Sequence, residues 1–181
     1  MKPRQQAVKP LPQEDIKRIF EYLEKNDFIV MYGVVKFALN TGLKMKEILE
    51  IKFEDINKKK KNFVLNSACL ETISLLKEYY FLKNIEPYNE GYLFKSLKNP
   101  DEAITYFGVD FYIRKIKKDL NIKYPFNTIS FKKTWARAVY DEYQDVAMLM
   151  KLLNQRSPEE TLNYIGLEAK PVINIYEKIV F

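Results

Sequence analysis

The chain has 181 residues, 47% of them hydrophobic, and a net charge of +6 at pH 7. This length favours a single globular domain, and the moderately basic balance is compatible with a polyanionic partner. The sequence has no histidine and one cysteine, Cys69, which excludes Ser-His-Asp and Cys-His catalysis, an internal disulfide and a multi-cysteine zinc site. We expect neither a metal nor a cofactor.

The N-terminal residues predict an extended leader. Residues 2–12 contain three prolines and no apolar segment of the kind that targets a chain for secretion. The longest apolar stretch, residues 28–39, is too short to span a bilayer, which needs ~20 residues. We therefore expect a cytoplasmic protein with a leader at residues 1–11 and one domain at residues 12–181.

Helical spacing of apolar residues begins after the leader. One face of the first predicted helix carries Ile16, Ile19, Phe20 and Leu23. Asp27 is predicted to cap a second helix over residues 28–40, which is apolar on nearly all sides and so should be buried. Gly42 is placed to end that helix in the left-handed conformation. A short third helix follows over residues 45–53.

The middle of the chain predicts very little β structure. Residues 55–62 form a polar turn, residues 63–65 a short strand and residues 92–94 a β fragment. Between them, Asn66 or Ser67 should cap a helix. The inner face of that helix is predicted to hold Leu70, Ile73, Leu76 and Tyr80.

The C-terminal half predicts four further amphipathic segments. Thr105 should cap a helix with an apolar inner face and an outer face of Arg114, Lys115, Lys117 and Lys118, which we interpret as solvated. Apolar residues at helical spacing follow over residues 131–139 and 146–153. The run Ser157-Pro158-Glu159-Glu160 is a strong start signal for a helix that stops at Gly166. An apolar tail occupies residues 171–181. The fold class is mainly α.

Three ordered segments resemble the tyrosine recombinase (phage integrase) family. FALNTGLKMKEILEIKFEDI at residues 37–56 is similar to the first family box, T-G-L-R-[IVM]-[ST]-E-[LI]-x-x-L-x-[WF]-x-D-[IV]. ISFKKTWA at residues 129–136 resembles the second, H-x-L-R-[HK]-[ST]-[FW]-A. LLNQRS at residues 152–157, followed by Thr161 and Tyr164, resembles the third. The resemblance covers about residues 11–170 and implies the helical catalytic domain of that family, with a truncated β element.

The resemblance implies a DNA-cleaving chemistry whose residues are mostly replaced here. In the family a tyrosine attacks a DNA phosphodiester, two arginines bind its oxygens, a hairpin lysine protonates the leaving oxygen, and two histidine-type positions assist. Tyr164 occupies the nucleophile position. Lys44 and Lys132 occupy the arginine positions, Ile129 and Gln155 occupy histidine positions, and the lysine hairpin is missing or severely shortened.

These replacements keep the positive charge but lose the bidentate arginine geometry. Loss of one preorganised donor typically costs ~10²–10³ in rate. We therefore expect a DNA-binding integrase-like protein, a regulator or accessory factor of a phage or mobile element, that has lost efficient strand cleavage. Contacts to double-stranded DNA are predicted from Lys44, Lys58, Lys59, Lys60, Lys61, Lys132, Lys133 and Arg156.

Two alternatives stay open. The first is a divergent, active recombinase that uses Tyr164. The second is a protein-interaction domain that pairs with a recombinase. The apolar tail is predicted to support a homo-oligomer, because exposed apolar surface at a terminus favours association.

Overall fold

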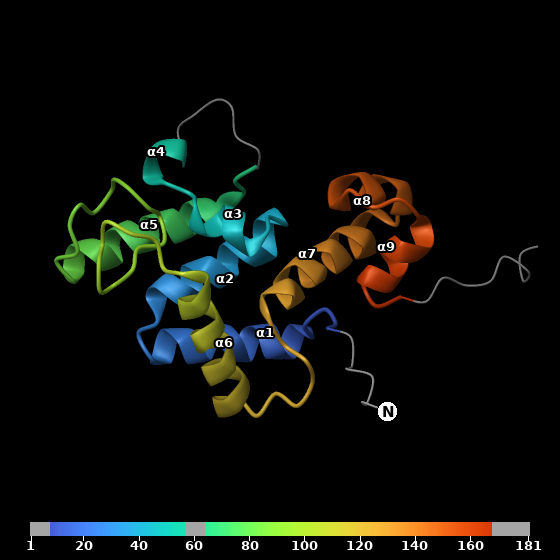
Figure 1. The fold of residues 1–181 in the computed structure, drawn as a ribbon, viewed down its shortest axis with the longest axis horizontal. Helices are drawn as coiled ribbons and strands as arrows, with labels where there is room; N and C mark the ends of the chain where they lie inside the picture. The colour runs from blue at the N-terminus through green and yellow to red at the C-terminus, as the bar shows by residue number, and fades with distance from the viewer. Residues whose placement is uncertain (1–7, 57–63, 168–181) are drawn as a thin grey trace, which may run out of the picture. The chain divides into compact units, whose positions relative to one another are not determined.

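The structure of the chain, a computed structural model, describes residues 8–56 and 64–167. Nearly all regular structure in these residues is helical, which confirms the mainly α prediction (Figure 1). The helices are α1 (Gln13–Lys25), α2 (Ile29–Thr41), α3 (Met45–Leu49), α4 (Phe53–Ile56), α5 (Ser67–Leu82), α6 (Tyr106–Asp119), α7 (Thr128–Tyr143), α8 (Val146–Leu153) and α9 (Pro158–Tyr164).

The chain divides into two compact units, Met1–Trp135 and Ala136–Phe181, and the division falls inside α7. The predicted leader and single domain therefore stay predictions, and the apolar tail lies outside the described residues. Each unit is described by itself below.

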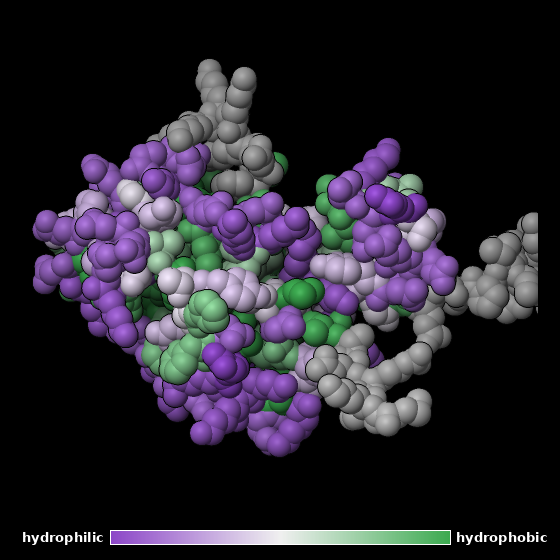
Figure 2. Space-filling model, in the orientation of Figure 1, coloured by the Kyte–Doolittle hydropathy of each residue, from purple (hydrophilic) through white to green (hydrophobic). Residues whose placement is uncertain are grey.

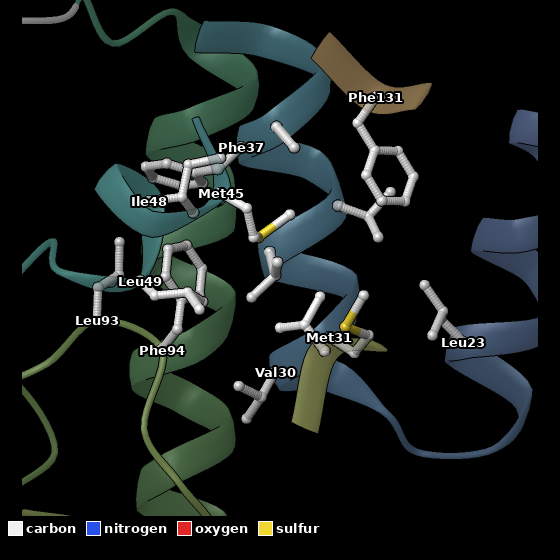
Figure 3. Close-up of a cluster of buried hydrophobic side chains, with 14 of the residues drawn as sticks. Leu23, Val30, Met31, Phe37, Met45, Ile48, Leu49, Leu93, Phe94 and Phe131 are labelled. Carbon is white, nitrogen blue, oxygen red and sulfur yellow. The ribbon is translucent and has the colours of Figure 1, made fainter. Parts of the chain in front are cut away.

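Helix α2 is the centre of the core in the first unit. It packs against α1 and α5 (Figure 1), which explains why its sequence is apolar on nearly all sides. Gly33 allows α5 to approach, because a Cβ there would lie 3.1 Å from a methyl group of Leu76. On the same helix, the ring of Phe37 meets that of Phe94 edge-on, with 5.1 Å between centroids (Figure 3).

Three predicted helix starts are confirmed by side-chain caps. The Asn66 side chain accepts a hydrogen bond from the backbone N–H of Cys69 at 3.0 Å, and Thr105 accepts one from Gly108 at 3.0 Å. Ser157 does the same for Glu160 at 3.1 Å. These caps depend on residues three positions apart, so the local sequence is enough to find them.

Three details of the predicted helices are wrong. The short helix predicted over residues 45–53 is interrupted, because residues 50–52 between α3 and α4 are not helical. Asp27 does not cap α2: its backbone is left-handed, and its carboxylate accepts a hydrogen bond from Lys83 at 2.6 Å. Leu70 is 50% exposed, whereas Cys69 and Thr72 are buried on the inner face of α5. At Asp27 a contact with a residue far along the chain overrides the local pattern.

The β structure of the described residues is limited to two isolated bridges. Lys52 pairs with Tyr92 and Lys95 pairs with Ala103, both antiparallel. The predicted β fragment at 92–94 therefore exists in minimal form. Residues 64 and 65 are not in a strand, whereas residue 63 lies outside the described residues.

The segment before α1 is fastened to the first half of α7. The backbone N–H of Leu11 donates to Oγ1 of Thr134 at 2.7 Å, and the Leu11 side chain is buried. The ammonium group of Lys133 donates to the carbonyl of Val8 at 2.8 Å. Two successive residues of α7 thus fix this segment in place.

A close contact joins the end of α2 to α7 within the first unit. Gly42 ends α2 in the left-handed conformation, at φ 65°. A Cβ on Gly42 would lie 2.4 Å from the indole of Trp135, so no larger residue fits beside that ring. This contact fixes the start of the first family box against the second.

The second unit contains the α8–α9 helical pair. Asp145 caps α8 by accepting from the backbone N–H of Met148 at 2.9 Å, and Asn154 ends that helix in the left-handed conformation. Leu149, Thr161 and Ile165 are buried. Each of the two helices therefore has a defined buried side.

Gly42→Ala should destabilise the fold by about 2–4 kcal/mol, because it adds left-handed backbone strain to a clash with Trp135. Gly91→Ala is the matched control. Gly91 also has a positive φ, of 68°, but its nearest neighbour would be 3.5 Å from the new Cβ, so only the backbone strain of ~1–2 kcal/mol applies. Urea unfolding of both variants gives the two values, and equal losses would contradict the clash.

Candidate functional site

Lys44 stands between α2 and α3, at the first arginine position of the family box. Its backbone is extended, at φ −70° and ψ 148°, and its side chain is exposed. The backbone N–H of Lys44 donates to the carboxylate of Glu47 at 2.6 Å. Glu47 thus caps the start of α3 and holds the backbone at Lys44 in place.

The second box begins at a well-defined helix start. The Asn127 side chain accepts a hydrogen bond from the backbone N–H of Ile129 at 2.9 Å, and the Ser130 hydroxyl accepts one from the backbone N–H of Asn127 at 3.2 Å. Phe131 faces the core and is fully buried (Figure 3). Ile129, at the family's histidine position, is 49% exposed.

Lys132 is half-buried and lies within electrostatic range of the first box. Burial lowers the pKa of its ammonium group below the ordinary lysine value. The carboxylate of Glu47 opposes that shift, and the charge of Lys44 adds to it. Lys44 and Lys132, which the resemblance aligns with the two arginines of the family, therefore lie close enough to influence one another's charge, and Glu47 lies within the same range of Lys132.

Two lysines and one carboxylate leave this place with an excess of positive charge. Half-burial makes the charge of Lys132 costly without an anion, because water screens it incompletely. A phosphate oxygen would supply the missing counter-charge. The arrangement can bind a phosphate, but two ammonium groups cannot supply the planar bidentate grip of two guanidinium groups.

The other basic side chains that are predicted to contact DNA lie in different surroundings. Lys133 is half-buried and its ammonium group is held by the carbonyl of Val8. Arg156 is exposed. The lysines at 58–61 lie outside the described residues. These predicted DNA contacts stay predictions.

The third box lies in the second unit and runs from the end of α8, at Leu152 and Leu153, through the turn into α9. The Gln155 side-chain oxygen is buried and has no hydrogen-bond partner among the described residues. Tyr164 is the last residue of α9 and is half-buried, and burial raises the pKa of its hydroxyl. A phenol with a raised pKa is less ionised, so attack on phosphorus would need a nearby base or cation.

Sequence reasoning missed one buried lysine. Lys95 is 1% exposed, and its ammonium group donates to the carbonyls of Glu90 at 2.8 Å and Pro100 at 3.4 Å. Burial lowers its pKa. Its position directly after the buried pair Leu93-Phe94, in a β bridge, was the available signal. These contacts assign Lys95 to holding the loop together.

Two hollows in the first unit have volumes of about 510 and 470 Å³. Neither is lined by Lys44 or Lys132. In the part of the chain that the structure describes, no helix is long and apolar enough to cross a membrane.

Comparison with known proteins places these residues in a family. Residues 9–170 match the model of the phage integrase family. The probable integrase/recombinase YoeC of Bacillus subtilis (strain 168) is 26% identical over 166 residues, which cover 86% of this chain and 87% of that protein. A probable integrase/recombinase of Acholeplasma phage L2 is 24% identical over 175 residues, 91% of this chain and 60% of that protein.

Solved structures share the fold. The XerA recombinase matches with a TM-score of 0.69 at 18% identity, over 97% of this chain and 68% of that one. The Tn1549 transposon integrase, in complex with circular intermediate DNA, matches with a TM-score of 0.71 at 11% identity, over 99% of this chain and 67% of that one. Since the family model covers nearly the whole chain, including all three boxes, the chain belongs to the phage integrase family of tyrosine recombinases.

Proposed function

We propose that this member of the family binds double-stranded DNA through phosphate contacts at Lys44 and Lys132 and cleaves it inefficiently or not at all. The observation that carries the proposal is the close approach of Gly42 and Trp135, which brings the segments of Lys44 and of half-buried Lys132 within electrostatic range of one another. Both side chains come from family arginine positions and both keep the positive charge. Phosphate contacts of this kind position a protein on DNA without reading sequence.

Two solved structures with the same fold support this proposal, because each contains DNA. The structure of a Tn1549 integrase variant with one arginine-to-lysine substitution holds a circular intermediate DNA. The structure of a tyrosine-to-phenylalanine variant of that integrase holds transposon right-end DNA. In that protein, replacing an arginine by lysine or a tyrosine by phenylalanine is compatible with a DNA complex.

The loss of cleavage is proposed from the replaced positions. Ile129 has no group that can donate or accept a proton, and Gln155 has no titratable group. The raised pKa of Tyr164 adds to the need for a base or a cation. Such a protein would act as a regulator or accessory factor of a mobile element.

A divergent recombinase that uses Tyr164 is the second candidate. It is favoured by Tyr164 itself, which stays at the end of α9 behind the confirmed cap of Ser157. A third candidate is a domain that pairs with a recombinase. It depends on the apolar tail, whose residues lie outside those that the structure describes.

The double substitution Lys44→Ala and Lys132→Ala should weaken binding to all duplex sequences alike, on the order of tenfold per lysine. The slope of log affinity against log salt should fall by about 2, since each phosphate contact contributes about 0.9. Mobility shift across a salt series with a mixed duplex pool measures both quantities.

The matched control is Lys17→Ala with Lys83→Ala, which removes the same charge. Lys17 pairs with Glu21 and Lys83 with Asp27, both away from the two family boxes. This control should keep nearly the whole salt slope. If both double variants lost the same affinity and salt slope, the effect would come from net charge alone, and the assignment of Lys44 and Lys132 to phosphate contacts would be wrong.

Incubation with nicked duplex DNA should give no covalent band on a denaturing gel, and Tyr164→Phe should bind DNA as the natural chain does. Both results follow if the hydroxyl is not activated. A covalent band that disappears in Tyr164→Phe would instead establish the divergent recombinase. Absence of any salt-sensitive shift would favour the protein-interaction candidate.

DNA affinity should fall as the pH rises from neutral to alkaline, and should do so at a lower pH than for Lys132→Arg. The affinity falls because a phosphate binds the protonated form of Lys132, which is lost as the pH rises. Burial lowers the pKa of Lys132 in the free protein, so this loss begins at a lower pH than for an ordinary lysine. An arginine at this position stays protonated throughout. Anisotropy titrations at constant salt compare the two proteins, and superimposable pH curves would show that Lys132 does not contact DNA.

A further inference from the structure

One of the two hollows in the first unit lies between the start of α2, the first half of α6 and residues 95–98. Its volume of about 510 Å³ falls in the range of roughly 300–1,000 Å³ that is typical of small-ligand sites. Figure 2 shows hydrophobic side chains gathered over α6 within a mostly hydrophilic surface. We call this hollow the α2–α6 pocket. Its apolar lining includes Phe28, Met31, Leu97, Ile104, Phe111 and Tyr112.

Aromatic rings form one wall of the α2–α6 pocket. The ring of Tyr112 meets that of Phe28 edge-on, with 5.0 Å between centroids, and that of Phe111 with 5.6 Å between centroids. Met31 is only 1% exposed, whereas Phe111 is 58% and Leu97 50% exposed. The pocket therefore has a buried apolar part and an exposed apolar rim. Because the three rings support one another, this wall is formed before a ligand arrives.

The charge along the α2–α6 pocket has one sign. Its charged lining residues are Lys95 and Lys98, and no carboxylate of the described residues lines it. The buried ammonium group of Lys95 donates to the carbonyls of Glu90 and Pro100, and an ammonium group can donate three hydrogen bonds. Three carboxylates act on Lys95 from outside the pocket. Lys98 is exposed, so its charge is accessible to a ligand.

These two features define the chemistry of a ligand. Aromatic rings pack well against other rings when they meet edge-on or offset, so a flat aromatic body suits the ring wall. A lysine ammonium binds a carboxylate through a charge-assisted hydrogen bond. A strongly polar ligand such as a nucleotide would place many hydrogen-bonding groups against apolar walls, which is costly.

We propose that the α2–α6 pocket binds a small aromatic carboxylate, with its ring against Phe28 and Phe111 and its carboxylate at Lys98. Lys95, three residues away along the chain, adds positive charge. Thr105, which caps α6, also lines the pocket. A ligand there would contact the starts of α2 and α6 at once and stabilise the folded chain. This inference goes beyond the proposed function and does not rest on DNA binding.

The test titrates the full chain with 2-naphthoate and with the neutral analogue 2-naphthylmethanol in an isothermal titration calorimeter. The two probes share the ring system and differ in the charged group. Naphthoate should bind at one saturable site, about tenfold more tightly than the alcohol, because a hydrogen bond to a charged group is stronger than one to a neutral group.

Two substitutions of exposed residues, which should leave the fold intact, locate the site. Lys98→Ala should weaken naphthoate binding about tenfold and leave the alcohol unchanged. Phe111→Ala should weaken both probes about fivefold, because it removes a ring contact. The matched controls are Lys17→Ala and Phe81→Ala. Both side chains are exposed and neither lines the pocket, so both controls should bind the two probes as the natural chain does.

Each outcome decides for or against the pocket. Absence of saturable naphthoate binding at millimolar concentration overturns the inference, and equal affinity for the two probes overturns the carboxylate contact on which it depends. Binding that survives both Lys98→Ala and Phe111→Ala places the site elsewhere and also overturns it. If Phe111→Ala instead lowers the sedimentation mass without changing probe affinity, the surface is a contact between copies of the chain and the inference is wrong. The mobility shift that tests DNA binding is a separate measurement, so either idea can fail alone.

Discussion

The indole of Trp135 lies against Gly42 so closely that no side chain fits between them. Everything that gives the first unit a functional surface depends on this contact. It fixes the end of α2 against α7, and so places Lys44 near Lys132 although the two are far apart in the sequence. Together with Phe131, which is buried in the core, this contact fixes the capped start of α7 relative to the capped start of α3.

The resulting cluster is unbalanced in a way that suits a phosphate ligand. Burial and the charge of Lys44 both act against the ammonium of Lys132, and the carboxylate of Glu47 compensates in part. A folded protein holds such a cluster at a cost, which a bound anion would remove. The same cluster lacks the forked donors that a pair of arginines would present to a developing negative charge. Under the proposed function, attraction to phosphate and poor catalysis would thus have one physical origin.

Sequence reasoning succeeded where the determining contacts are local. The caps at Asn66, Thr105 and Ser157 and the left-handed Gly42 need only their near neighbours. It failed at Asp27 because the carboxylate pairs with Lys83, just beyond the end of α5, and it missed the burial of Lys95, which follows the buried pair Leu93-Phe94. The family boxes predict Lys44 and Lys132 as site residues, and this stays a prediction. Other findings needed the three-dimensional structure. They are the proximity of these two lysines, the hydrogen bond from Lys133 to the carbonyl of Val8, and the burial of the Gln155 side-chain oxygen.

The attachment of residues 8–11 to α7 has a mechanical consequence. Lys133 and Thr134, which hold this segment, follow Lys132 directly on the helix. Tension applied to the chain ahead of Val8 would therefore be borne by the first turns of α7 before it reached α1. Because two single hydrogen bonds break before a packed helix yields, the segment would peel from α7 first and uncover the side of the helix next to Lys132.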